Sequence, residues 1–226
     1  MNSTKLLLTS VLIGLMFTSS HAGQHLIDFA GNGANSSGGA AGWDVLDNLV
    51  QDTPYPLTDL SGGGDDDVIL TAIDDGFNPN NPAPPGVDAT YDGILVPKEA
   101  RDDYLFKIDD TAGTSARIKI ENLDAGQYNI TVFEGRQTDP TQFAKIWVGD
   151  ASGSGEPAVE NTGNFAQGSA TVGVDISAGD TLWYRHLEDN TGGISGMIIN
   201  VVPEPSASVL LILGILPLLT YRRRMR

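Results

Sequence analysis

Short runs of alternating apolar and polar residues, separated by clusters of Gly, Pro, Asn and Asp, constrain the fold of this chain most. The clearest example is residues 115–148, where apolar side chains occupy every second position of 116–120 and again of 128–132. A period of two is typical of a strand with one buried face, and Leu123-Asp124-Ala125-Gly126 between the runs is typical of a turn. The pattern predicts a hairpin at this place.

Similar runs recur along the chain and helical periodicity is almost absent, which predicts about nine or ten strands. So many strands favour an all-β fold, an antiparallel two-sheet β-sandwich, over one open sheet. Residues 31–42 and 77–92 are predicted to be loops, the second because it holds four prolines. The further predicted strands are 25–29, 68–73, 104–108, 143–148, 170–176, 182–186 and 194–202, with 43–50 and 55–60 as two less regular candidates.

The charge is strongly acidic and is concentrated between the two ends of the chain. Residues 23–202 hold 28 of the 29 Asp and Glu but 8 of the 13 Lys and Arg, a formal charge of −20. Such a field repels phosphate backbones and suits divalent cations or neutral and cationic polymers, which argues against nucleic-acid binding. The absence of cysteine excludes disulfides, thiolate metal sites and a cysteine nucleophile.

Residues 1–22 have the order of a secretory signal peptide. Lys5 precedes a mostly apolar run over 6–17, and small residues then lead to a cut between Ala22 and Gly23. The alternative, an amphipathic core helix, predicts polar residues at helical spacing, whereas only Thr9 and Ser10 interrupt the run. We therefore expect export, with a mature domain over 23–201.

The C-terminal residues 202–226 combine a proline-flanked acid, a short apolar run and a basic end. Residues 207–221 are apolar, and as a helix they would reach about 22 Å, less than the roughly 30 Å of a bilayer core. The terminal arginines would keep the end of this short transmembrane helix in the cytoplasm. An ordinary C-terminal anchor is the alternative. The motif comprises Val202, Pro203, Glu204 and Pro205, and the membrane stop comprises Arg222, Arg223, Arg224 and Arg226.

This C-terminal segment resembles the PEP-CTERM sorting signal. The family occurs in Gram-negative bacteria that make extracellular polysaccharide, and the resemblance implies processing of the tail by an exosortase. It also implies the secretion machinery as a partner, a transient stay in the inner membrane, and then a place at the cell surface or in the extracellular matrix. The two prolines would keep the peptide extended where an enzyme could reach it.

The middle of the chain resembles jelly-roll domains of the galactose-binding-like or carbohydrate-binding type. The resemblance rests on Leu26-Ile27-Asp28-Phe29, on Trp43, on 123–132 and on Gly135-Arg136. It supports the fold more than any ligand. The sorting tail, together with a sandwich that lacks a catalytic constellation, predicts a noncatalytic protein that associates with exopolysaccharide. Aromatic faces stack on sugars, so the candidate glycan contacts are Trp43, Tyr91 and Trp147, with core packing as the alternative, above all for Trp147 and Trp183.

Two acid clusters flank the predicted strand 68–73 and could supply oxygen ligands to a structural calcium ion. Their spacing lacks the EF-hand pattern, and solvated strand ends are the alternative. The clusters are Asp65, Asp66 and Asp67 on one side and Asp74 and Asp75 on the other.

We do not expect an enzyme, because no Gly-x-Ser-x-Gly elbow is present and only two histidines follow the signal peptide. The main alternative is a secreted hydrolase acting on polysaccharide or esters, with His186 as its candidate base. A structural or adhesive matrix component with calcium-dependent self-association is a third reading.

The sorting hypothesis predicts that replacing Glu204, or deleting residues 203–205, abolishes processing and localisation in the native host. Mass spectrometry of the mature C-terminus, with cell fractionation, measures both. Unchanged cleavage and localisation in these variants would show that the motif is not a sorting signal.

Overall fold

The computed structural model describes residues 23–29, 39–46, 49–61, 67–74, 77–80, 87–101, 104–107, 116–134, 142–166, 168–187 and 193–203. The predicted signal peptide and nearly all of the C-terminal segment lie outside these residues. Within the described ranges, no helix has the length and apolar character needed to cross a bilayer. Residues Ala22–Val202 form one compact unit.

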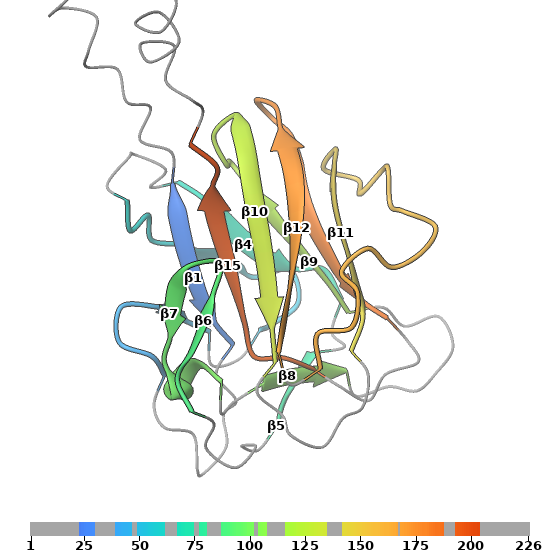
Figure 1. Ribbon diagram of the computed structural model, residues 1–226. Coiled ribbons are helices and arrows are strands. Elements are labelled where there is room, and N and C mark those ends of the chain that lie inside the picture. The colour runs from blue at the N-terminus through green and yellow to red at the C-terminus, as the bar shows by residue number, and fades with distance from the viewer. Residues whose placement is uncertain are drawn as a thin grey trace, which may run out of the picture. The chain divides into compact units, whose positions relative to one another are not determined.

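This unit is all-β, which confirms the predicted class, and its main strands form two five-stranded sheets that face each other (Figure 1). The described strands pair antiparallel, except for the short parallel contact between β1 and β2, and an isolated parallel bridge joins Gln51 and Ala72. The first sheet has the order β12 (Ser169–Ile176), β10 (Gly126–Phe133), β15 (Gly196–Val201), β1 (Gln24–Asp28), β2 (Asp44–Val45). The second has the order β11 (Ala144–Gly149), β13 (Thr181–His186), β9 (Ala116–Glu121), β4 (Ile69–Ala72), β3 (Pro54–Pro56).

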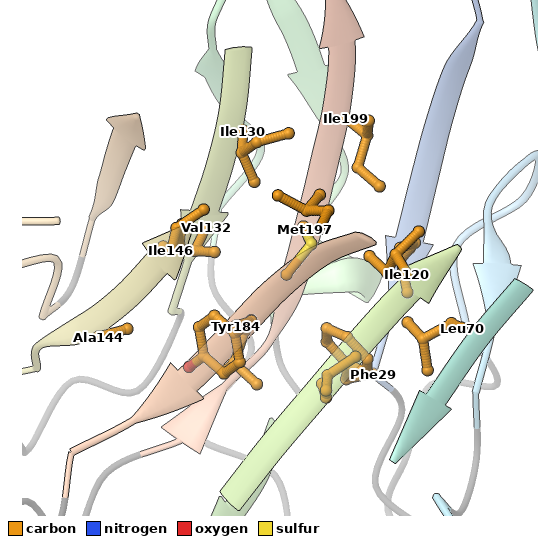
Figure 2. Packing of buried hydrophobic residues seen from close by; sticks show 14 of the residues in the cluster. Phe29, Leu70, Ile120, Ile130, Val132, Ala144, Ile146, Tyr184, Met197 and Ile199 are labelled. Carbon is orange, nitrogen blue, oxygen red and sulfur yellow. The ribbon is translucent and has the colours of Figure 1, made fainter. Parts of the chain in front are cut away.

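The main core lies between the two sheets and is built from the inward side chains of both (Figure 2). Alternation puts Ile130 and Val132 of β10 on the same face, opposite Ile120 of β9 and Tyr184 of β13 across the interior. Each of these side chains is 1% exposed or less. The period-two pattern thus corresponds to one buried face on each sheet.

The predicted hairpin over 115–148 is wrong in its pairing, although both of its strands are present. β9 pairs with β13 and β4, whereas β10 pairs with β12 and β15. The connection, in which Asn122 has φ +68° and Leu123 is buried, carries the chain from one sheet to the other. An alternating pattern shows which residues share a face, but it does not show which strand lies alongside.

The predicted loop over 77–92 also differs from the structure, because its two ends form strands. β5 (Phe77–Asn80) is the edge of a small sheet with β8 (Tyr104–Lys107) and β14 (Gly193–Ile194), and an edge strand accepts Pro79. β6 (Ala89–Tyr91) and β7 (Ile94–Val96) form a hairpin. Asp92 and Gly93 make its two-residue turn with φ of +49° and +77°, as a type I′ turn requires.

The first and last strands of the unit are neighbours in the first sheet. Gln24 is opposite Asn200 and Asp28 is opposite Gly196, so β15 lies between β1 and β10 (Figure 1). Both faces of this central strand are covered, Ile199 by the main core and Ile198 by a second apolar cluster.

Gly196 is the position where this packing is tightest. A Cβ there would lie 2.6 Å from the carbonyl oxygen of Ile27 and would overlap the ring of Phe133. We predict that Gly196→Ala lowers the free energy of unfolding by about 1–3 kcal/mol, because the backbone of β1 cannot move aside. Urea denaturation followed by circular dichroism measures this. Gly173→Ala is the matched control, since a Cβ there meets only a side-chain oxygen at 3.9 Å, and equal stabilities would contradict the prediction.

Candidate functional site

The second apolar cluster lies on the outer face of the first sheet and brings two predicted glycan contacts together. Phe133 of β10 is its centre, with Ile198 of the adjacent β15 and Leu26 of β1, the strand beyond it. The ring of Trp43 meets Phe133 edge-on at a centroid distance of 5.9 Å, and the ring of Tyr91 lies 5.5 Å from it. Residues far apart in the sequence thus converge on one aromatic side chain.

A buried carboxylate holds the turn that carries Trp43. Asp28 is fully buried at the end of β1, and its Oδ2 accepts a hydrogen bond of 2.7 Å from the backbone N–H of Ala40. The N–H of Trp43 in turn donates to the carbonyl of Ala40, and Gly42 between them has φ +83°. Because the carboxylate is out of water and bonded, it ties this turn firmly to the sheet.

Trp43 borders a surface hollow of about 160 Å³ that is lined by Gly42, Trp43, Asp44, Thr58 and Leu60. Both carboxylate oxygens of Asp44 are held by Thr58, one by its backbone N–H at 2.7 Å and one by its hydroxyl at 2.8 Å. The hollow therefore combines an aromatic ring, a carboxylate in a fixed position and a hydroxyl. It can accept hydrogen bonds from a polar ligand whose apolar side lies on the indole.

His25 lies behind this hollow and supports Thr58 from the interior. Its Nδ1 is 3.0 Å from the carbonyl oxygen of Thr58, and the side chain is fully buried. Burial lowers the pKa of His25 below its usual value, against the opposing effects of the Thr58 carbonyl, Asp59 and Asp44. The neutral imidazole donates from Nδ1.

Tyr91 supports the cluster and is itself largely enclosed. Besides Phe133, the guanidinium of Arg101 lies over its ring, 5.5 Å from the centroid. Burial raises the pKa of the Tyr91 hydroxyl, and the nearby Arg101 charge opposes this. The ring of Tyr91 thus already contacts Phe133 and Arg101 of the protein itself.

Trp147 is 5% exposed and stacks on Trp183, with 5.8 Å between ring centroids and 14° between planes. The turn after β11 covers this pair, and the indole N–H of Trp183 donates to the carbonyl of Asp150. The hydroxyl and N–H of Ser152 and the N–H of Ser154 hold the pKa of the exposed Asp150 carboxyl at about 2. Trp147 therefore lies within packed structure, away from Trp43.

The acid residues predicted to bind calcium are described only in part, and calcium binding stays a prediction. Asp74 makes a two-pronged ion pair with Arg117, at 3.0 Å and 3.1 Å, while Asp67 uses its backbone carbonyl to accept from Asn122. Asp65, Asp66 and Asp75 lie outside the described residues. Within the described residues, no group of three or more His, Asp or Glu could hold a metal ion.

His186, the residue named for the hydrolase alternative, is the last residue of β13 and its side chain is buried, at 2% exposed. Its Nδ1 is 3.0 Å from the hydroxyl of Tyr184, and its ring meets Phe165 edge-on. Burial and the nearby Glu134 both raise the pKa of Tyr184. A substrate could not reach His186 without opening this packing.

The C-terminal motif begins where the first sheet ends. Val202 still donates its N–H to the carbonyl of Gln127 at 2.8 Å, and Pro203 follows directly. Gly23, on the mature side of the predicted signal cut, is buried just before β1. Ala22, Glu204, Pro205, Arg222, Arg223, Arg224 and Arg226 lie outside the described residues.

Comparison with known proteins assigns no family: no family profile and no curated protein matches the chain. Three solved structures share 11–14% identity. Protein YXIM of Bacillus subtilis has a TM-score of 0.43 over 81% of this chain, which spans only 41% of that protein. CBM35 from Paenibacillus barcinonensis has a TM-score of 0.30, with 59% of this chain and 98% of the module covered.

A family 35 carbohydrate binding module from Clostridium thermocellum also has a TM-score of 0.30, with 66% of this chain and 98% of the module covered. These scores are low, so the function is argued from the residues of this chain.

The buried His25 predicts a loss of stability in mild acid. Because its pKa is lowered in the folded state, the unfolded chain takes up the proton first as the pH falls below about 6.5. The free energy of unfolding should therefore decrease from pH 7.5 to pH 5.5, and less so in His25→Gln, whose side-chain amide can still donate to Thr58. Urea denaturation at the two pH values measures this; identical decreases in both proteins would contradict it.

Proposed function

We propose that the chain is an exported surface or matrix protein whose β-sandwich binds extracellular polysaccharide without catalysis. The observation that carries the proposal is the hollow at Trp43, where an aromatic ring lies beside a carboxylate held in place by Thr58. The predicted signal peptide and the Pro-Glu-Pro tail support export and a place at the cell surface or in the matrix. The proposed partners are the secretion machinery and an exosortase, and the chain would stay in the inner membrane only transiently.

The hollow fits the two-sided chemistry of a sugar ring. The C–H face of a pyranose can lie on the indole of Trp43, while its hydroxyls donate to the carboxylate of Asp44. Because Thr58 already fixes that carboxylate, little side-chain entropy is lost when a ligand binds. The volume of about 160 Å³ is below the roughly 300 Å³ at which drug-sized pockets begin, which suits one unit of a longer chain.

The charge of the site indicates which polysaccharides it suits. No Lys or Arg lines the hollow, and residues 23–202 carry a formal charge of −20. An anionic sugar would meet Asp44 and this overall field, so neutral chains are favoured. For the hydrolase alternative, the buried contacts of His186 offer no support.

Trp43→Ala should weaken binding to the neutral exopolysaccharide of the host about tenfold, because stacking on the indole is lost. Trp43→Phe, which keeps an aromatic ring against Phe133, is the matched variant and should retain most of the affinity. Affinity gel electrophoresis and calorimetry with purified polysaccharide measure both. Unfolding curves confirm that each variant is folded, and a Trp43→Ala protein that binds as well as wild type would exclude this hollow as the site.

A further inference from the structure

A row of amide side chains crosses the outer face of the first sheet. Gln24 of β1 is opposite Asn200 of β15, Asn200 is opposite Asn129 of β10, and Asn129 is opposite Gly173 of β12. The row therefore runs at right angles to the strands and ends at a glycine. Its positions carry no charged side chain, although the unit as a whole is strongly acidic.

The amides are connected to one another and to Asp92 in the turn of the β6–β7 hairpin. Gln24 Nε2 donates to Asn200 Oδ1 at 3.4 Å, and the Nδ2 groups of Asn200 and Asn129 donate to the Asp92 carboxylate at 3.3–3.5 Å. These bonds are longer than the usual 2.7–3.2 Å, so they are weak.

The contact with Asp92 also determines where the oxygen of Asn129 points. An ionised carboxylate only accepts hydrogen bonds, so Nδ2 of Asn129 must face Asp92. The Oδ1 atom then lies on the side of Gly173, 3.9 Å from the place where a Cβ of that residue would be. An acceptor is thus directed toward the space that glycine leaves open.

That space is a second hollow, of about 250 Å³, at the end of the amide row. Its polar side chains are those of Gln127, Asn129 and Asp175, and Gly173 forms part of its floor. It is therefore rich in hydrogen-bond acceptors, with the amide of Gln127 as a donor, and it is lined by no Lys or Arg. Planar amides can bond two neighbouring hydroxyls at once, as in a sugar diol.

We propose that this hollow and the amide row form a second polysaccharide subsite, which takes hydroxyl-bearing sugar units without anionic groups. The inference rests on the proposed function and extends it to a surface apart from the Trp43 hollow. Hydroxyls of the sugar donate to Asn129 and Asp175, and the Gln127 amide donates to a ring or hydroxyl oxygen. Asp92 positions Asn129 for this contact.

Gly173→Val provides the test, because it places a branched side chain at the floor of the hollow, where an added Cβ meets only Asn129 Oδ1, at 3.9 Å. A valine also suits an exposed strand position, so the variant should fold as well as wild type. Thr171→Ser, two residues earlier on the same exposed face of β12, is the matched control, because it keeps the hydroxyl that lies 2.8 Å from Oγ1 of the buried Thr131. The probes are hexasaccharides of a neutral glucan and of alginate, together with the neutral exopolysaccharide of the host.

We expect Gly173→Val to weaken binding of the neutral probes about tenfold, with Thr171→Ser within twofold of wild type. Neutral probes should also shift the side-chain amide NMR signals of Gln127 and Asn129, whereas alginate should not. Wild-type affinity in a folded Gly173→Val, or amide signals that stay unchanged at saturation, would overturn the second subsite while leaving the Trp43 site intact. A wild-type protein that binds none of the probes would overturn both proposals.

Discussion

The antiparallel pairing of β1 with β15 is the contact on which the rest of the structure depends. It joins residues at the two ends of the compact unit, from Gln24 with Asn200 to Asp28 with Gly196. β1 ends in the buried Asp28, whose carboxylate accepts a hydrogen bond from the backbone of Ala40 and so holds the turn before Trp43. The pairing also puts Gln24 and Asn200 side by side in the amide row. One register therefore places both candidate sugar-binding surfaces.

The sequence predicted the strands of the sandwich well, because alternation reports burial directly. Residues 128–132 alternate in the sequence, and β10 contributes Tyr128, Ile130 and Val132 to the core. Strand partners were less predictable, because β9 and β10 belong to different sheets and their connection passes from one sheet to the other. The pair Asp92-Gly93 is typical of a two-residue hairpin turn, but the prolines before it led to the prediction of a loop over the whole of 77–92.

For the candidate sites, residue types in the sequence indicated sugar binding, but the sequence did not show which of these residues lie close together. Trp43 and Tyr91 were named because aromatic rings bind sugars, but their shared contact with Phe133 depends on tertiary packing. Asn129 and Asn200 look like ordinary outward positions in the sequence. Only the register of three strands shows that they lie next to each other and to Asp92. Hollows lined by such residues carry no sequence signature of their own.

The central place of β15 has a consequence for folding after the export proposed above. Among the described residues β15 is the last strand in the sequence, and it pairs with both β1 and β10. A chain that crosses a membrane from its N-terminus exposes β1 first, and Gln24 of β1 must wait for Asn200, 176 positions later, before the two strands can pair. Val202 is still bonded to Gln127, and Pro203 follows at once. Under the proposed sorting, the last bond of the sheet and the motif would be adjacent, so completion of folding and release of the tail would compete for the same few residues.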